Sequence, residues 1–214
     1  MSLFNTMTGK IRLTKNHNLG LFTHINKYRV INLTQPEGNY SDFHACKLKT
    51  DDGFIMENVW QSCKVYKDLP AHKYKKFNIL MWKQKGEKHI DDNNKLTDAY
   101  FAWKQRLMEN KIPVVYPCGY SNRNKYQYIF HENKVYNLHD GFYNIYIPMY
   151  LHLIQKNIRF SELHYNISNG QNVLIICDNL PYEEIEFNLV NKEHIFYSSG
   201  YCLALALLRK FNIF

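Results

Sequence analysis

One short stretch, Asn172 to Asp178, most constrains the fold of this chain. Its sequence, Asn-Val-Leu-Ile-Ile-Cys-Asp, is a continuous run of apolar residues that ends in an acid. Such a run predicts a strand buried on both faces, so other elements must cover the sheet on both sides. Asp178 follows the end of this strand, where α/β sheets place site residues, and we predict it as a candidate catalytic carboxylate. The alternative is a turn or a helix-capping residue.

Apolar residues at helical spacing predict the helices that pack on this sheet. The clearest pattern places Leu96, Tyr100, Trp103 and Leu107 at i, i+4, i+7 and i+11, and we expect this stripe to face the core. Further helices are predicted over residues 70–85, 143–156, 161–167 and 201–211, the last of them capped by Ser198 or Ser199.

Shorter segments predict the remaining strands. Their pattern and turn residues indicate strands at 11–15 and 28–33, a short strand within 112–120, a hairpin of 126–130 with 135–138, and an acidic linker at 181–186. We find neither an internal repeat nor a domain boundary. The sequence therefore predicts a single compact α+β domain over residues 1–214, with several helices packed around a small sheet.

Charge and cysteine usage narrow the function classes. Lys and Arg number 27 against 19 Asp and Glu, a formal net charge of +8, which favours a polyanionic or phosphorylated partner; the alternative is a role in solubility alone. The five cysteines are widely spaced and odd in number, which argues against a disulfide framework and against a zinc site. Without a signal peptide or a long apolar run, we expect a soluble intracellular protein that does not associate with membranes.

A polar stripe follows the turn at Asp52-Gly53. Glu57, Trp60, Gln61 and Lys64 stand at i, i+3, i+4 and i+7, so on one continuous helix they would share a face. Together they could stabilise a cation, stack a flat ring, orient a polar edge and hold an anion. The alternative is a solvated helix face on which Trp60 packs into the core.

Around this stripe the sequence resembles the NADAR (YbiA-like) family. The residues that carry the resemblance are Tyr40-Ser41-Asp42-Phe43, Asp52-Gly53 and Glu57-Asn58-Val59-Trp60-Gln61-Ser62-Cys63-Lys64. They are similar to the family's Leu-Ser-Asn-Phe element, Asp-Gly turn and Glu-His-x-aromatic-Gln-x-x-Lys-Phe motif, with Asp42 in place of Asn and Asn58 in place of His. A weaker similarity to the closing Trp-Gly and Gly-x-x-Leu-x-x-Leu-Met elements lies at Tyr197-Ser198-Ser199-Gly200 and Cys202 to Arg209.

The resemblance implies an N-glycosidase that needs neither a metal nor another cofactor. The implied substrate is a ribosylated base or nucleotide, first an ADP-ribosylated guanine, free or in nucleic acid, and second a pyrimidine intermediate of riboflavin synthesis. Such a reaction passes through an oxocarbenium-like state, which a carboxylate stabilises. Glu57 carries over as the principal acid/base or cation-stabilising group, with Asp178 as a second carboxylate.

The remaining candidates would bind substrate. Trp60 or Tyr40 could stack the base, Gln61 could contact its edge or the ribose hydroxyls, and Lys64 could bind phosphate or keep Glu57 ionised. Further candidate substrate-binding residues are Ser41, Asp42, Phe43, Gly53 and Gly200.

A different class of function stays open. The net positive charge and abundant tyrosines also suit a non-enzymatic module that binds nucleic acid or another partner. Cys63 beside Lys64, or Cys118 with His139, could form nucleophile pairs, but no local motif supports either pair. The histidines show no metal-ligand spacing, and no Walker loop or Gly-x-Gly-x-x-Gly motif occurs.

Overall fold

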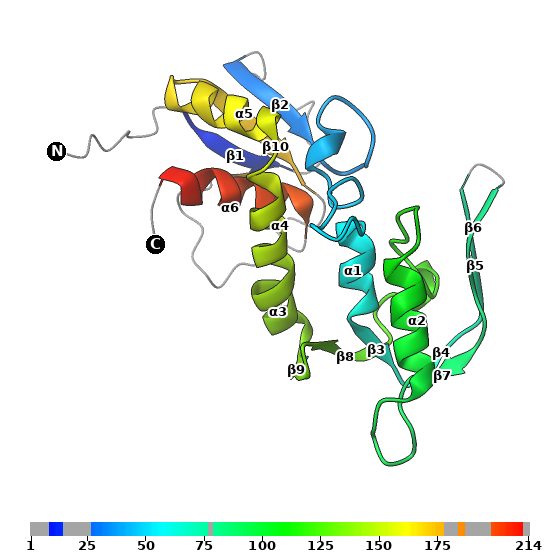
Figure 1. Cartoon of the computed structure of the whole chain (residues 1–214). Coiled ribbons are helices and arrows are strands. Elements are labelled where there is room, and N and C mark those ends of the chain that lie inside the picture. The colour runs from blue at the N-terminus through cyan, green and yellow to red at the C-terminus, as the bar shows by residue number, and fades with distance from the viewer. Residues whose placement is uncertain (1–8, 15–26, 77–78, 178–183, 187–197, 212–214) are drawn as a thin grey trace. The chain divides into compact units, whose positions relative to one another are not determined.

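The computed structural model describes residues 9–14, 27–76, 79–177, 184–186 and 198–211 (Figure 1). The chain divides into two compact units, which we call the terminal unit (residues 1–47 and 150–214) and the central unit (residues 48–149). Both contain helices and strands. The α+β class predicted from the sequence is confirmed, and the single domain predicted over residues 1–214 stays a prediction.

The terminal unit contains a four-stranded sheet around the predicted buried strand. In the order β11-β1-β10-β2, its strands are β11 (Glu184–Glu186), β1 (Ile11–Thr14), β10 (Asn172–Ile176) and β2 (Tyr28–Asn32). β10 pairs in parallel with both β1 and β2, and its residues from Val173 to Ile176 are at most 1% exposed. The strands predicted at 11–15, 28–33 and 172–178 are therefore confirmed over residues 11–14, 28–32 and 172–176.

The prediction of an acidic linker at 181–186 is wrong for its last three residues. Residues 184–186 form β11, which pairs antiparallel with β1, and residues 181–183 lie outside the described residues. Glu-Ile-Glu alternates polar and apolar residues, and that pattern suits an edge strand as well as a linker. The neighbouring strand β1 supplies the backbone partners, so a non-local contact decides the structure.

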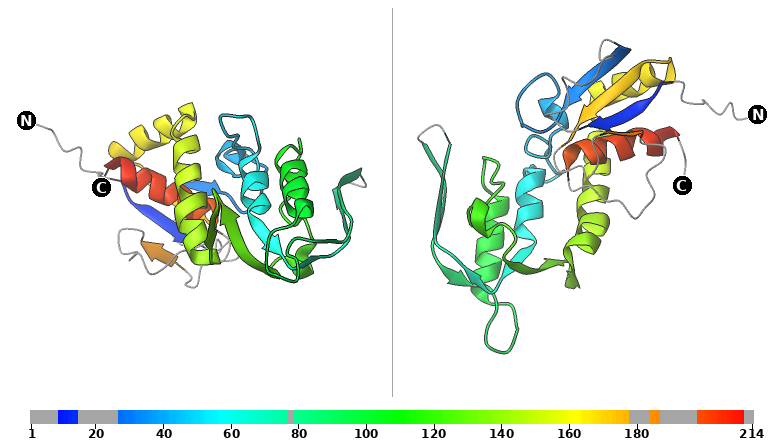
Figure 2. Two further views of the ribbon diagram at one scale, coloured as in Figure 1. Left: turned by 60° about the horizontal axis from the view of Figure 1, so that its bottom comes forward. Right: turned by 180° about the vertical axis from the view of Figure 1, so that it is seen from behind.

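Two longer helices complete the terminal unit. α5 (Ile158–Ser168) begins after Asn157, whose side chain accepts a hydrogen bond from the Arg159 amide, and it starts three residues earlier than predicted. α6 (Ser199–Phe211) is capped by Ser198, whose hydroxyl accepts a hydrogen bond from the Tyr201 amide at 3.2 Å, as predicted. It lies alongside β1 and β10 (Figure 2). A short 3₁₀ turn, η3 (Ser41–Phe43), also belongs to this unit.

In the central unit, α1 (Met56–Ser62) leads into a three-stranded antiparallel sheet. Its order is β3-β8-β9, with β3 (Lys64–Tyr66), β8 (Tyr126–His131) and β9 (Lys134–Tyr136). β8 and β9 form the predicted hairpin, and its turn residues Glu132 and Asn133 have φ angles of 47° and 60°, which is the backbone of a tight turn between antiparallel strands.

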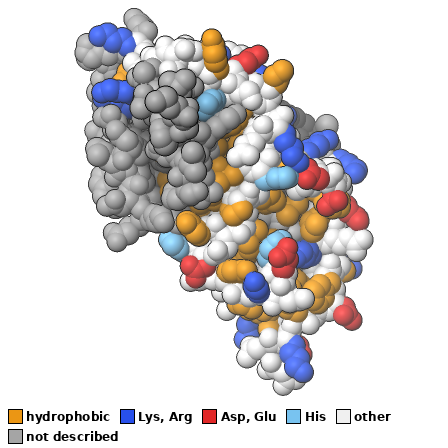
Figure 3. Space-filling view, turned by 60° about the vertical axis from the view of Figure 1, so that its left-hand side comes forward, with side chains coloured by type: hydrophobic (Ala, Val, Ile, Leu, Met, Phe, Trp, Pro, Cys, Tyr) orange, Lys and Arg blue, Asp and Glu red, His pale blue; other side chains and the backbone are white. Residues whose placement is uncertain are grey.

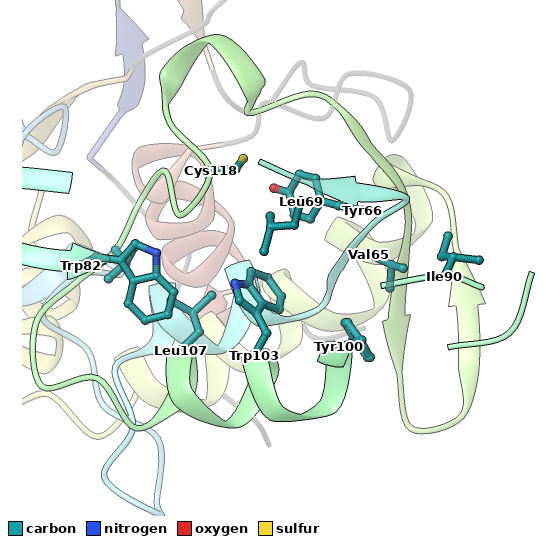
Figure 4. Close-up of a cluster of buried hydrophobic side chains, with 10 residues drawn as sticks. Val65, Tyr66, Leu69, Trp82, Ile90, Tyr100, Trp103, Leu107 and Cys118 are labelled. Atoms are coloured by element: carbon teal, nitrogen blue, oxygen red, sulfur yellow. The ribbon is translucent and has the colours of Figure 1, made fainter. Parts of the chain in front are cut away.

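α2 (Asp98–Met108) supplies the core of the central unit. Tyr100, Trp103 and Leu107 are fully buried, as their spacing predicted, and Thr97 caps the helix by accepting a hydrogen bond from the Tyr100 amide at 3.3 Å. Figure 4 shows the cluster that these side chains form with strand and loop residues, namely Val65, Tyr66, Leu69, Trp82, Ile90, Val114 and Cys118.

The helix predicted over residues 70–85 is wrong. The chain instead forms β5 (His72–Lys76) and β6 (Ile79–Gln84), an antiparallel ribbon beside the small pair β4 (Asp68–Leu69) and β7 (Glu87–Lys88). Apolar residues in a short mixed segment suit either structure, so long-range contacts decide. Here the buried Trp82 donates its indole N–H to the Pro117 carbonyl at 3.0 Å, which anchors β6 to a distant loop.

The loop that supplies this carbonyl was predicted to contain a short strand within 112–120, but these residues form no strand. Pro113 and Pro117 lack the N–H that a strand pairing needs. A 3₁₀ turn, η4 (Tyr120–Asn122), follows.

The helix predicted over residues 143–156 is present, but it is irregular. It consists of α3 (Leu138–Gly141), a π-helical turn η5 (Phe142–Tyr146) and α4 (Ile147–Ile154). Pro148 explains the widened turn, because proline lacks a donor and clashes with the carbonyl one turn earlier. None of the described helices combines the length and apolar character needed to cross a bilayer.

Candidate functional site

A tight turn positions the start of the predicted site. The Gly53 amide donates to the Thr50 carbonyl at 2.8 Å, and the Phe54 amide donates to the Thr50 hydroxyl at 3.1 Å. Gly53 has a φ of +82°, in the left-handed region that favours glycine. It is exposed and open space surrounds its Cα, so its backbone conformation accounts for the glycine.

The polar stripe starts on a helix and ends on a strand. α1 stops at Ser62, so Glu57, Trp60 and Gln61 are helical, whereas Lys64 begins β3. The prediction that all four side chains share one continuous helical face is therefore wrong for Lys64. The antiparallel pairing of Lys64 with Ile129 of β8 ends the helix early, because the strand ladder supplies the backbone partners that another helical turn would have supplied.

All four side chains of the stripe are buried. Glu57 is 8% exposed, Trp60 and Gln61 are each 5% exposed, and Lys64 is 9% exposed. A solvated face is therefore the wrong interpretation. A buried carboxylate and a buried ammonium in the same small region are uncommon, because removing each charge from water costs several kcal/mol.

Burial dominates the electrostatics of this pair. The Glu57 carboxylate accepts a hydrogen bond from the Gln61 carboxamide at 2.8 Å. Desolvation raises the pKa of Glu57, and the Gln61 hydrogen bond and the Lys64 charge offset part of that rise. Desolvation also lowers the pKa of Lys64, with Glu57 opposing it. Both groups are thus shifted toward their neutral forms.

Aromatic rings surround the Lys64 ammonium and fix Trp60. The Lys64 Nζ lies 5.8 Å from the centre of the Trp60 ring and 5.4 Å from that of Tyr126, within range of cation–π attraction. Trp60 also meets Phe142 and Tyr146 edge to face, with centroid distances of 6.0 and 5.4 Å. Trp60 therefore packs in an aromatic cluster, as the alternative interpretation expected.

Asn58, which departs from the family motif, has a structural role. Its carboxamide donates to the carbonyls of Asn110 and Ile112, each at 3.0 Å, and accepts from the Val114 amide at 2.8 Å. A histidine could not make all three of these hydrogen bonds, because its ring carries only two nitrogens. Asn58 thus holds the loop after α2 against α1, a role that the sequence did not indicate.

The Tyr40 to Phe43 segment lies in the terminal unit. Phe43 is fully buried and its carbonyl accepts the Tyr150 hydroxyl at 2.6 Å, while the Ser41 amide donates to the Gly38 carbonyl. Asp42 accepts hydrogen bonds from Arg159 at 2.7 Å and from Asn157 at 2.9 Å.

Two arginines that the sequence did not single out surround Tyr40. The centre of the Tyr40 ring lies 4.9 Å from the Arg159 Cζ and 5.5 Å from the Arg29 Cζ. Arg29 stands 11 positions before Tyr40 and Arg159 stands 117 positions after Asp42. The sequence did not indicate that both side chains reach this ring.

The two remaining candidate site residues are Gly200 and Asp178. Gly200 lies buried on α6, where an added Cβ would stand 2.4 Å from the Cys177 Sγ and 3.1 Å from the Ile175 Cγ2. Close packing of α6 on β10 accounts for this glycine. Asp178, the predicted second carboxylate, lies outside the described residues.

The nucleophile pairs considered from the sequence involve buried thiols. Cys63 donates its S–H to the Val59 carbonyl at 3.3 Å, and its Sγ lies 3.8 Å from the His131 Nδ1. Burial raises the pKa of the Cys63 thiol to about 11, so the reactive thiolate is scarce at neutral pH. The pKa of the buried Cys118 is raised in the same way, and its Sγ lies 3.4 Å from the Asn122 carbonyl.

Within the described ranges, no three His, Cys, Asp or Glu side chains come together to hold a metal ion. Comparisons of the chain with models of protein families, with curated proteins and with solved structures found no match. Membership of the NADAR family therefore stays a prediction.

Proposed function

We propose that this protein is an N-glycosidase that hydrolyses the bond between a ribose C1′ and a base nitrogen, with Glu57 as its essential carboxyl group. The observation that carries the proposal is the burial of Glu57 beside Gln61, with the Lys64 charge near enough to affect its pKa. Perturbed titratable groups of this kind are enriched at functional sites.

The raised pKa of Glu57 suits the acid half of this reaction. A carboxyl group whose pKa is raised holds its proton to a higher pH than usual, and it can donate that proton to a departing base. Once ionised, the same group stabilises the positive charge that develops at C1′. Lys64 favours the ionised form of Glu57, and Gln61 holds the carboxylate in one orientation.

The substrate follows from the family resemblance. An ADP-ribosylated guanine, free or in nucleic acid, is our first candidate, and a pyrimidine riboflavin intermediate is the second. Because Trp60 packs against Phe142 and Tyr146, we assign it to shaping the site and not to stacking the base.

The test compares wild-type protein with Glu57→Gln for release of ADP-ribose from ADP-ribosylated guanosine and from ADP-ribosylated DNA. We expect release by the wild type and a loss of at least about 100-fold in the variant, the scale of general acid–base catalysis. Circular dichroism should show that the variant is folded.

Glu109→Gln is a matched control. Glu109 also accepts a hydrogen bond from a glutamine one helical turn away, Gln105, at 3.0 Å, but it is exposed at the end of α2. This control should keep full activity. Equal activity of the Glu57 variant and the wild type would refute the role of Glu57, and no release from any of the ribosylated bases would refute the reaction class.

A specific observation favours a second candidate function, binding of nucleic acid. Lys73 and Lys83 stand directly opposite each other on the β5–β6 ribbon, and both are exposed. Like charges in this position destabilise a ribbon unless an anion lies between them. The ribbon projects beyond α2 (Figures 1 and 2), although its Trp82 packs in the core of the central unit. A projecting ribbon of this kind suits a groove-binding element.

The two candidate functions predict that different substitutions abolish activity or binding. Binding of a DNA duplex through the ribbon should weaken steeply with salt, fall in Lys73→Gln/Lys83→Gln and persist in Glu57→Gln. Among the residues that Figure 3 colours by type, Lys and Arg are interspersed with Asp and Glu. DNA retention that is insensitive to the ribbon variant would exclude this second function.

A further inference from the structure

We infer that Arg29 and Arg159 form a binding site for a phosphate or pyrophosphate group at Tyr40 of the terminal unit. The inference does not depend on the proposed glycosidase activity, because it uses none of the residues around Glu57. It rests on how the two guanidinium groups are held.

Arg29 is oriented without being neutralised. Its Nε donates to the Tyr40 hydroxyl and its Nη1 donates to the Gln171 side-chain oxygen at 3.4 Å. Both acceptors are uncharged. A guanidinium has five N–H donors, so these two contacts leave others for a ligand. Among the described residues, its side chain makes no ion pair with a carboxylate.

Arg159 is held by a carboxylate. Its Nη1 donates to the Asp42 carboxylate at 2.7 Å, and Asn157 donates to the second oxygen of the same carboxylate at 2.9 Å. The Arg159 side chain is still 40% exposed. Asp42 therefore fixes the direction of Arg159 and leaves part of its guanidinium accessible.

The two guanidinium groups are close enough to act on one ligand. Their Cζ atoms lie 5.5 and 4.9 Å from the centre of the Tyr40 ring, so they are separated by no more than the sum of these distances, about 10 Å. Among the described residues, Asp42 is the one acid that forms an ion pair with either of these two cations, so this part of the cluster keeps a net positive charge. Planar guanidinium groups match the oxygens of a phosphate and bind it through paired hydrogen bonds.

Tyr40 organises the site and does not serve as a stacking surface. Its hydroxyl accepts from Arg29, its ring contacts Arg159, and the Phe43 ring lies 5.7 Å away at a tilt. These contacts take up the ring, so the structure assigns a phosphate group to the site and assigns no base to Tyr40.

The test is calorimetric titration of the full-length chain with inorganic pyrophosphate, ADP and adenosine. We expect pyrophosphate and ADP to bind at one site, more weakly as NaCl is raised, and adenosine not to bind. Arg29→Gln should weaken pyrophosphate binding about tenfold or more, since it removes a charge-assisted contact. Tyr40→Phe, which keeps both charges but removes the acceptor that orients Arg29, should cause a smaller loss.

Arg123→Gln is the matched control. Arg123 also lies over a tyrosine ring, with its Cζ 3.8 Å from the centre of Tyr120, but it belongs to the central unit. This variant should bind pyrophosphate as the wild type does. Equal losses in the Arg29 and Arg123 variants would reveal general charge attraction and overturn the inference, as would absence of pyrophosphate binding by the wild type.

The Glu57→Gln variant separates this inference from the proposed activity. It should bind pyrophosphate normally whether or not the protein releases ADP-ribose. Binding that depends on Arg29 in a protein without glycosidase activity would sustain the phosphate site and refute only the proposed function. Far-UV circular dichroism of Arg29→Gln, with Arg29→Lys as a variant that keeps the charge, distinguishes lost binding from lost folding.

Discussion

Acidification should destabilise this protein through His89, a histidine in the core of the central unit. Its side chain is fully buried, and its ring packs against Trp103 and Tyr100, with centroid distances of 4.7 and 5.3 Å. The His89 Nδ1 accepts a hydrogen bond from the Tyr66 amide at 3.3 Å. Protonation of Nδ1 would remove that acceptor and place a charge among aromatic rings.

The structure gives the size and the sign of the effect. Desolvation, and then the charge of Arg106, lower the pKa of His89 from 6.5 to about 4. In the unfolded chain His89 therefore binds a proton below pH 6.5, whereas in the folded chain it binds one only below about pH 4. The stability that neutral His89 contributes is fully present above pH 6.5 and is lost as the pH falls from 6.5 to about 4. Between pH 7 and pH 5 the loss is about 2 kcal/mol, at 1.36 kcal/mol per pKa unit.

Urea unfolding at pH 7 and pH 5, followed by circular dichroism, measures this loss. The comparison variant is His89→Gln, whose carboxamide oxygen can still accept from Tyr66 but does not titrate. Wild type should lose about 2 kcal/mol more than the variant between the two pH values. Other titrating groups cancel in this comparison, including His44, whose pKa burial also lowers to about 4. Equal losses would refute the assignment to His89.

Three further substitutions test the packing around the candidate residues. Asn58→Ala leaves the buried Val114 amide without its partner and should lower the free energy of unfolding in urea by about 2–3 kcal/mol; a loss below about 0.5 kcal/mol would contradict the role of Asn58. Gly53→Ala should cost about 1–2 kcal/mol in thermal unfolding, because its left-handed backbone strains alanine, and an unchanged Tm would contradict this. Gly200→Ala brings a methyl group against Cys177 and should cost about 1–3 kcal/mol in urea unfolding. Cys177→Ala should relieve part of that cost in the double variant, and strictly additive losses would argue against the clash.

Elements with a strong local pattern were predictable from the sequence. Tyr100, Trp103 and Leu107 repeat with the helical period over two turns, and they form the buried face of α2. The run from Val173 to Ile176 is apolar at every position, and it forms most of β10, an interior strand of its sheet with a parallel neighbour on each side. In both cases one structure satisfies the whole segment, so the local pattern was sufficient.

Elements whose pattern suits two structures were not predictable. Residues 70–85 contain apolar side chains at spacings that fit a helix, yet they form the β5–β6 ribbon. What decides is the contact between Trp82 and Pro117, 35 positions away, which no local window contains. Arg29 and Gln171, which also form a hydrogen bond, are 142 positions apart in the sequence. Local propensity is a weak guide where such tertiary contacts compete with it.

The polar stripe shows how far a local pattern can lead toward a site. Helical spacing correctly grouped Glu57, Trp60 and Gln61, because residues three or four positions apart lie on the same face of a helix whatever surrounds it. Spacing gave no information on burial, which depends on the elements that pack over the helix. Burial is what shifts the pKa of Glu57, so the chemistry proposed for this residue comes from its tertiary surroundings. The pair of Glu109 and Gln105 has the same hydrogen bond at an exposed position. Comparing the activities of Glu57→Gln and Glu109→Gln therefore measures what burial contributes to the proposed role of Glu57.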